Sequence, residues 1–361
     1  MARYRADTPA ARLRDAPIRA RRRTRRWVVG GLSTYVVVCL VALAGLVLTA
    51  PGTTLTHAGA AQAAEGTPRE AGVVPASARS VPDGRVEDPG RTVRALPSGW
   101  AEVGPLLADT VTEARDEGFT MGACVLAIDS ADERIVCAGE EEPRYAASVI
   151  KVAYAVGALE AYRGNPRATT PYGTLGDLLE DAITVSDNDA ANLLYDLTVD
   201  GPAAPRTDEP ITALNTIADR VGLADVFHTG GAFREVWTGD LSQVSARGSV
   251  NYLNELVRAA DGRAESGEAL TSQPVARQVL ALMLRQERDW KLPDQLPSGA
   301  AANKTGETDT ESHDIAVVNT ASGRYAIAVI ATANGMYSTP DHLMSQLGYD
   351  VTDALGGAAK F

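Results

Sequence analysis

The sequence predicts an α+β protein with two lobes, one built on a five-stranded antiparallel sheet and the other all-helical. Its 361 residues are 45% hydrophobic, which is enough apolar material for a large buried core. Strand-like alternation occurs in two separate parts of the chain, before residue 140 and after residue 300, with helical patterns between them. Strands so far apart in the sequence must find partners, and one shared sheet provides them.

The first part of this fold begins with a helical pattern that starts at Trp100. Two strands follow at 120–128 and 134–138, and the polar residues between them are typical of a hairpin turn. Several helical stretches then occupy most of 148–285 and supply the helices of the second lobe.

The last part of the chain returns to strand patterns, at 301–305, 315–320 and 325–332. Residues 319–323 are typical of a turn between the last two of these strands. A final helix is predicted from about Pro340. The three late strands complete the predicted sheet.

The N-terminal residues predict a single membrane-spanning helix. Ten arginines and two aspartates give residues 1–26 a formal charge of +8, and the uncharged run at 27–50 is long enough to cross a bilayer. The basic segment is expected to stay in the cytoplasm, so that everything after it lies outside. The alternative is a cleaved signal peptide, since 61–63 form an A-x-A site; the domain would then be secreted.

Composition divides the exported part into a linker and a folded domain. Residues 51–97 are rich in Ala, Gly, Pro and Thr with no apolar period, which is typical of a flexible linker, and 98–361 form the folded domain. The chain after residue 26 has a formal charge of -20. Such an acidic body repels phosphate backbones, so nucleic-acid binding is excluded. The sequence says nothing about the oligomeric state.

The cysteines leave two interpretations open. If the hairpin turn centres on 130–131, Cys124 and Cys137 lie directly opposite each other on neighbouring strands, where a disulfide can form outside the cell. The alternative is a pair of small buried thiols.

The first candidate catalytic motif is Ser148-Val149-Ile150-Lys151, at the start of an apolar helical run. A spacing of three places the hydroxyl and the amine on one helix face, one turn apart. An amine whose pKa is lowered by desolvation can take the proton of a serine nucleophile. The backbone N–H groups at a helix start can also stabilise an oxyanion. The alternative is a serine that only caps the helix.

Two further motifs contain groups that suit the same chemistry. Ser186-Asp187-Asn188 precedes a helix, where a loop serine and asparagine could reach a substrate; helix capping is the alternative. Lys304-Thr305-Gly306 lies on the first late strand, and its cation, hydroxyl and glycine suit the binding of a carboxylate. The alternative there is an exposed strand lysine before a turn.

The order S-x-x-K, S-D-N, K-T-G resembles the signature of class A β-lactamases and penicillin-binding proteins. The stretches at 175–194 and 296–334 are similar to the corresponding parts of class A β-lactamases, and the resemblance covers about 98–361. It implies a transpeptidase-like fold with a sheet lobe, a helical lobe and a site between them. This agrees with the order of elements read from the sequence.

The resemblance also implies a role for each motif. Ser148 is the expected nucleophile, Lys151 the proton acceptor and Ser186 the proton relay to the leaving nitrogen. The expected substrate contacts come from the side chains of Asn188, Lys304 and Thr305, with Gly306 completing the K-T-G motif. The backbone N–H groups of Ser148 and Glu307 are the implied oxyanion donors.

Two departures limit what the resemblance implies. The segment between Lys151 and Ser186 is shorter than is usual in the family, which predicts a reduced wall of the cleft. The E-x-x-L-N loop, whose Glu positions the water for deacylation, is not found. Glu235 is the only candidate for that role, and an ordinary surface carboxylate is the favoured interpretation. Without that Glu we expect a long-lived acyl-enzyme.

Histidine contributes one candidate. His313 lies at the start of a strand where the family often places a cation near the substrate carboxylate, so it is a candidate binding residue, with a structural role as the alternative. The four histidines show no metal-ligand spacing, and neither a metal nor a cofactor is expected.

The sequence therefore predicts a membrane-anchored, extracytoplasmic serine hydrolase acylated at Ser148 by β-lactams or by D-alanyl peptides. The alternative is a penicillin-recognising or wall-binding module that hydrolyses its ester slowly or not at all.

Overall fold

The computed structural model describes residues 94–361 except for 131–133, 140, 237–238, 264–268 and 336–338. These residues belong to one compact unit, Arg85–Phe361. The predicted basic segment, membrane helix and most of the linker lie outside the described residues. Among the described helices, none combines the length and apolarity needed to cross a bilayer.

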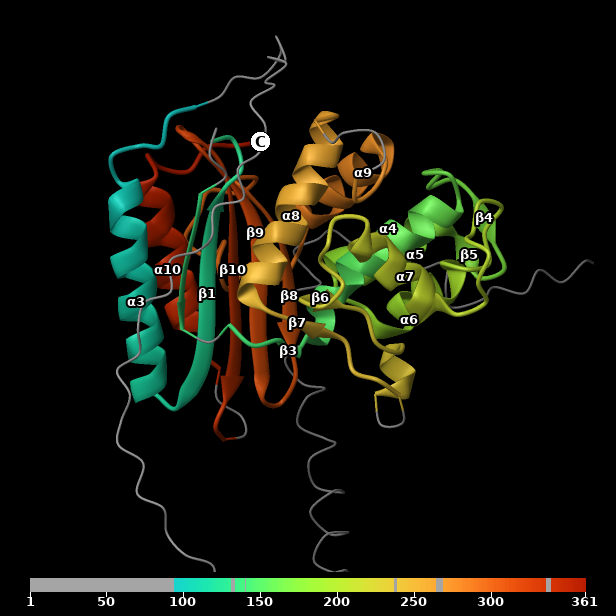
Figure 1. Ribbon diagram of the computed structural model, residues 1–361, viewed down its shortest axis with the longest axis horizontal. Coiled ribbons are helices and arrows are strands. Elements are labelled where there is room, and N and C mark those ends of the chain that lie inside the picture. Colours follow the sequence, from blue (N-terminus) through green and yellow to red (C-terminus); the bar gives the residue numbers. More distant parts are fainter. Residues whose placement is uncertain (1–93, 131–133, 140, 237–238, 264–268, 336–338) are drawn as a thin grey trace, which may run out of the picture. The chain divides into compact units, whose positions relative to one another are not determined.

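A five-stranded antiparallel sheet in the order β2-β1-β10-β9-β8 forms the first lobe, as predicted (Figure 1). Its strands are β1 (Phe119–Ala127), β2 (Ile135–Gly139), β8 (Ala301–Glu307), β9 (Glu311–Thr320) and β10 (Gly323–Ala333). The early strands thus share one sheet with the late ones.

Strand β9 begins four residues before the predicted 315. Residues 311–314 are polar, so they interrupt the alternation on which the prediction rests. Residues 312–314 nevertheless pair with β8, and the interiors of both strands are buried. Hydrogen bonding across the ladder therefore extends the strand beyond its apolar pattern.

Helices cover both faces of the sheet (Figure 1). Helices α3 (Trp100–Asp116) and α10 (Asp341–Ala354) lie side by side on one face, over an apolar core that includes Leu107, Ile327 and Val351. Helix α8 (Ala246–Asp261) packs on the other face. The sheet is thereby buried on both sides, and its β8 edge faces the helical lobe.

The helical lobe is built around one apolar helix. Helix α4 (Lys151–Ala161) is buried at ten of its eleven positions, as expected for a helix that is apolar all round. Its neighbours are α5 (Leu175–Thr184), α6 (Asn188–Leu197), α7 (Pro210–Asp219) and α9 (Gln273–Met283). Because its first residue is buried, α4 carries a lysine into the interior of the protein.

Short strands and turns complete the fold. A small sheet joins β3 (Arg144–Tyr145), β7 (Gln243–Val244) and β6 (Phe227–His228), and β4 (Thr169–Thr170) pairs with β5 (Gly173–Thr174). Two 3-10 turns are η4 (Ala147–Ile150) and η5 (Phe233–Glu235). Turn η4 follows β3 directly and leads into α4.

The two cysteines of the first hairpin form a disulfide. Cys124 on β1 pairs with Cys137 on β2, and their sulfurs are bonded. This confirms the predicted register and selects the disulfide over the alternative of two free thiols. The bond joins the edge strand β2 to the sheet.

Candidate active site

Strand β8 exposes one edge to the helical lobe, and its register decides which backbone groups point there. The Thr308 N–H donates to the Glu311 carbonyl across the turn, at 3.0 Å. In an antiparallel ladder hydrogen-bonded pairs alternate, so the next pair, Glu307 with Ser312, does not exchange bonds. The Glu307 N–H therefore points to the free edge, in agreement with its implied role as an oxyanion donor.

The predicted nucleophile lies on η4, which packs against this edge. Ser148 does not cap the helix, because Ala146 is the N-cap residue and no side chain caps η4. Ala147, just before Ser148, has a φ of 44°, in the left-handed region that non-glycine residues rarely adopt. Such strain is common at active sites and needs surrounding support. Here the Ala146 N–H donates to the Ser242 carbonyl at 2.8 Å.

The loop with the S-D-N motif both caps a helix and supplies polar groups to the site. The Asp187 carboxylate caps α6 by accepting the Ala190 N–H at 2.8 Å. Ser186 has a φ of 62°, which turns its hydroxyl and carbonyl away from the helix and toward the buried lysines. Capping thus accounts for Asp187, whereas Ser186 and Asn188 belong to the site.

Lys151 is completely buried and meets three oxygen atoms. Its Nζ donates to the Ser186 carbonyl at 2.7 Å and to Asn188 Oδ1 at 2.7 Å, and Ser186 Oγ lies 3.2 Å away. Burial, with a smaller contribution from the Arg288 charge, lowers the pKa of Lys151 to about 7. A neutral amine has two N–H donors and one lone pair, so the two carbonyl-type acceptors leave the lone pair for a hydroxyl.

Lys304 approaches the same hydroxyl from the sheet. Its Nζ donates to Ser186 Oγ at 2.9 Å and to the Thr305 carbonyl at 2.8 Å, and its side chain is fully buried. The alternative of an exposed strand lysine is therefore wrong. Burial and the nearby Lys151 amine hold the pKa of Lys304 well below its ordinary value. The Ser186 hydroxyl thus links two amines from different lobes.

The S-x-x-K spacing predicts a direct hydrogen bond between Ser148 Oγ and Lys151 Nζ, at about 2.6–3.2 Å. Among the described residues the amine instead bonds to Ser186 and Asn188. No hydrogen bond in the described part of the chain joins Ser148 Oγ to Lys151 Nζ, so the prediction of a direct contact is wrong. The 3-10 winding of η4 still places positions three residues apart on one face, so the two side chains lie on the same side of the turn.

An open cleft of about 550 Å³ lies over this cluster. Ser148, Asn188 and Glu307 line it together with the apolar side chains of Phe233 and Leu241. Lys151, Lys304 and Thr305 are buried beneath its wall, at 0%, 0% and 1% exposure. The structure therefore brings the three predicted motifs together, and the substrate contacts implied for Lys304 and Thr305 stay predictions.

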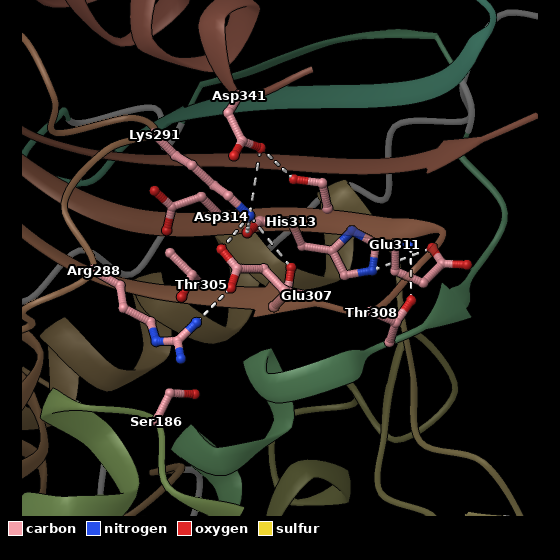
Figure 2. A network of polar contacts seen from close by, with 12 residues as sticks. Ser186, Arg288, Lys291, Thr305, Glu307, Thr308, Glu311, His313, Asp314 and Asp341 are labelled. Carbon is pink, nitrogen blue, oxygen red and sulfur yellow. Dashed lines mark hydrogen bonds and ion pairs between the residues drawn. The ribbon is translucent and has the colours of Figure 1, made fainter. Parts of the chain in front are cut away.

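A network of charged side chains surrounds the Glu307 carboxylate at the end of β8 (Figure 2). The fully buried Lys291 reaches between the Glu307 carboxylate, 3.2 Å from its Nζ, and that of Asp341, at 3.8 Å. Arg288 meets the same Glu307 carboxylate, and its Nε donates to the Val185 carbonyl at 3.3 Å. Arg288 therefore connects the S-D-N loop to β8 beside the proposed oxyanion donor.

Asp314 is a second buried charge behind the K-T-G strand. It accepts hydrogen bonds from Asn303 Nδ2 at 3.0 Å and from the Leu292 N–H at 3.1 Å. Burial nevertheless raises the pKa of Asp314 to about 7. The carboxyl joins β8, β9 and the loop before β8, which fixes the strand that carries Lys304.

His313 has a structural role, and the predicted substrate contact is wrong. The Ala331 N–H donates to Nδ1 at 3.1 Å, which assigns the ring proton to Nε2 and lets it donate to the Tyr145 carbonyl at 2.8 Å. Both nitrogens are therefore used by the backbone. Burial lowers the pKa of His313 to about 4, so the ring is neutral and supplies no cation. The histidine instead holds β3, and with it the start of η4.

Glu235 lies on η5, and its carboxylate contacts residues of its own turn. Its Oε2 accepts the Ala232 N–H at 3.2 Å and its Oε1 lies 3.5 Å from Arg234 Nε, with 40% of the side chain exposed. The side chain of this turn that reaches Lys151 is Phe233, whose ring centroid is 4.8 Å from Nζ. An aromatic ring thus lies beside the amine.

Sequence reasoning missed Arg288, Lys291 and Phe233. Arg288 and Lys291 lie in a loop, and nothing in their local sequence indicates that they meet Glu307. Lysine is scarce, however: only four occur in the chain, and three of them are buried around β8. The scarcity of lysine is therefore the sequence feature that could have identified Lys291 as a functional candidate.

Comparison with known proteins gives one family. A model of the beta-lactamase enzyme family matches residues 162–355. This range contains the S-D-N and K-T-G motifs and begins after Ser148 and Lys151, so the placement of those two residues rests on the structure. No curated protein matches the chain.

Solved structures give the fold. The chain is 20% identical to the beta-lactamase from Sphaerobacter thermophilus, covering 71% of this chain and 95% of that one, with a TM-score of 0.54. It is 18% identical to a class A beta-lactamase from Bacteroides cellulosilyticus, covering 71% of this chain and 98% of that one, with a TM-score of 0.56. It is 22% identical to the beta-lactamase from Desulfarculus baarsii, covering 72% of this chain and 98% of that one, with a TM-score of 0.54. These similarities confirm the class A β-lactamase fold.

Proposed function

Because the chain belongs to the beta-lactamase enzyme family, we propose that it is a serine hydrolase whose Ser148 is acylated by β-lactams or D-alanyl peptides. One observation carries the proposal: Ser186 Oγ lies 3.2 Å from Lys151 Nζ and 2.9 Å from Lys304 Nζ, beneath the cleft that Ser148 lines. A hydroxyl held between two desolvated amines suits proton transfer.

Acylation begins with the neutral amine of Lys151. The Ser148 hydroxyl gives its proton to Nζ while Oγ bonds to the substrate carbonyl carbon. The proton then passes through the Ser186 hydroxyl to the leaving nitrogen, the carbon–nitrogen bond breaks, and an ester on Ser148 remains. Lys151 ends the step neutral, ready for a second proton transfer.

The oxyanion of the tetrahedral intermediate requires two preorganised donors. The N–H of Glu307 points from the free edge of β8, and the N–H of Ser148 lies at the start of η4, which packs on that edge. The Glu307 carboxylate is held by Arg288 and Lys291, so this end of the strand is fixed before substrate binds.

Lys304 suits the binding of a substrate carboxylate. Beside Lys151 its charge is disfavoured, but an incoming carboxylate favours its protonated form. The resulting ammonium in turn disfavours a second charge on Lys151. Substrate binding therefore keeps the proton acceptor neutral.

A second candidate function is a penicillin-recognising module that hydrolyses its ester slowly. The observation that favours it is Phe233, since this apolar side chain from η5 meets Lys151 while Glu235 caps its own turn. Loss of about 1.4 kcal/mol of stabilisation slows deacylation about tenfold. Both functions share the acylation step.

Mass spectrometry with a penicillin and a chromogenic cephalosporin tests the proposal. The protein should gain the mass of one β-lactam on the peptide that contains Ser148, and Ser148→Ala should abolish the gain. Fast colour release with no stable adduct indicates a hydrolase, and a stable adduct indicates the slow module. Labelling that persists in Ser148→Ala would show that the nucleophile is another residue.

We propose in addition that the domain lies outside the cytoplasmic membrane, anchored by 27–50. The run of uncharged residues after ten arginines supports this location. Protease added to cells without their wall should digest the domain, and N-terminal sequencing of the mature protein distinguishes an anchor from a cleaved signal. A domain that stays protected in these wall-free cells would contradict the location.

The rate of acylation should depend on pH through Lys151. Since burial lowers the pKa of this amine to about 7, the neutral form that accepts the proton predominates above that pH. The second-order acylation rate should rise about tenfold per pH unit below the midpoint and level off above it. Stopped-flow measurement between about pH 5.5 and about pH 9 checks this. A rate that falls with rising pH would contradict the role of a neutral amine.

Glu235→Gln should change neither acylation nor ester hydrolysis by more than about twofold, since surface substitutions have small effects. The amide oxygen of glutamine can still accept the Ala232 N–H, so the turn is retained. Single-turnover kinetics of the variant measure both steps. Hydrolysis slowed more than about tenfold, by about 1.4 kcal/mol, would place Glu235 in the hydrolytic step.

A further inference from the structure

Phe233 lies at the cleft, next to the Lys151 amine. Its side chain lines the cleft, and its ring lies 4.8 Å from Lys151 Nζ. The ring also packs against Tyr154 in a T-shaped arrangement, with 6.0 Å between ring centroids. Phe233 therefore covers the amine where cleft water would otherwise reach it.

The turn that carries Phe233 is held on both sides. Arg234 donates to the Asp196 carboxylate of α6 at 3.0 Å, and its N–H donates to Asn192 Oδ1 at 3.2 Å. Before the ring, the Tyr154 hydroxyl donates to the Gly231 carbonyl at 3.1 Å. These bonds on either side of Phe233 fix the ring over Lys151.

We propose that Phe233 is a positioning residue that keeps water from the Lys151 amine and thereby lengthens the lifetime of the ester on Ser148. Hydrolysis of that ester adds a hydroxyl from water to the acyl carbon and a proton to Ser148 Oγ. The attacking water needs a proton acceptor, and the amine that the ring covers can serve as one. The proposal rests on the proposed function of Ser148.

The ring and water both favour the charged form of the amine, but water does so more strongly. An aromatic face attracts an ammonium, which favours the charged form of Lys151. Water solvates an ammonium more strongly than a ring does, so exchanging the ring for water favours the charged form further. Opening this side should therefore raise the midpoint at which Lys151 titrates and admit the hydrolytic water.

Two variants of the full chain separate water exclusion from packing. Phe233→Ala removes the cover, whereas Phe233→Leu keeps an apolar side chain there and serves as the matched control. After labelling with a penicillin, the adduct half-life should fall at least about tenfold in Phe233→Ala and stay within about threefold in Phe233→Leu. Thermal unfolding of both variants checks that each is folded.

A second measurement does not depend on labelling. The chain has only four lysines, so NMR of 13C-labelled lysine side chains can follow Lys151 directly through a pH titration. The Lys151 midpoint should rise by about one pH unit in Phe233→Ala and change little in Phe233→Leu.

The outcomes are distinguishable. An unchanged Lys151 midpoint in folded Phe233→Ala overturns the proposal, and so does an adduct whose half-life is unchanged or shortened equally in both variants. If wild-type protein is never labelled, the proposed function fails, whereas the NMR titration still decides whether Phe233 excludes water.

Discussion

Lys151→Met is expected to slow acylation of Ser148 at least about a thousandfold, since a positioned acid–base group contributes about 10²- to 10⁴-fold. Methionine fills a similar volume without a proton acceptor. The loss should appear in the acylation rate constant rather than in substrate affinity, because the amine lies beneath the cleft wall. Stopped-flow acylation at saturating and subsaturating substrate separates the two.

The chain provides a matched control for this lysine. Lys360 is exposed near the C-terminus, and Lys360→Met makes the same chemical change away from the cleft. Its acylation rate should stay within about twofold of wild type. Retention of more than about a tenth of the wild-type rate in folded Lys151→Met would show that another group takes the serine proton.

Gly306→Ala should both destabilise the protein and disable the site. A Cβ on Gly306 would lie 2.9 Å from the Ala146 carbonyl oxygen and 3.1 Å from Val149, so η4 must move away from β8. Overpacking of this kind typically costs about 1–3 kcal/mol. Because Ser148 lies on η4, a shift of about 1 Å should also slow acylation about a hundredfold. Denaturant unfolding and acylation kinetics measure the two effects.

Gly335→Ala is the control for the glycine change. An added Cβ there meets nothing within 4 Å, so the unfolding free energy should change by less than about 0.5 kcal/mol. A Gly306→Ala variant that is as stable and as reactive as this control would mean that the contact between β8 and η4 does not position the nucleophile.

Most of the sheet could be predicted because apolar alternation marks its strands. The five strands and their division between two parts of the chain agree with the structure. The prediction failed at the start of β9, where polar residues pair across the ladder without an apolar pattern. Their partners come from tertiary structure, which local periodicity does not contain.

The site was predictable to the extent that its motifs are local. The three motifs meet as expected, with Ser186 between the two lysines. The oxygen atoms that Lys151 meets were not predictable in detail, since they come from a loop 35 residues away that tertiary packing brings to the amine. The contacts of Phe233 with Lys151 and of Arg288 with Glu307 form only when distant loops come together, so no local sequence pattern predicts them.

The two buried groups Lys151 and Asp314 link proton binding to folding in opposite ways. The pKa of Asp314 rises from 3.8 to about 7, so its contribution to stability falls as pH rises through that interval. The pKa of Lys151 falls from 10.5 to about 7, so its contribution grows from there toward alkaline pH. Together these groups support the fold least near neutrality, where the amine becomes reactive. The pH at which Lys151 becomes able to accept a proton is therefore also the pH at which these two groups contribute least to the stability of the fold.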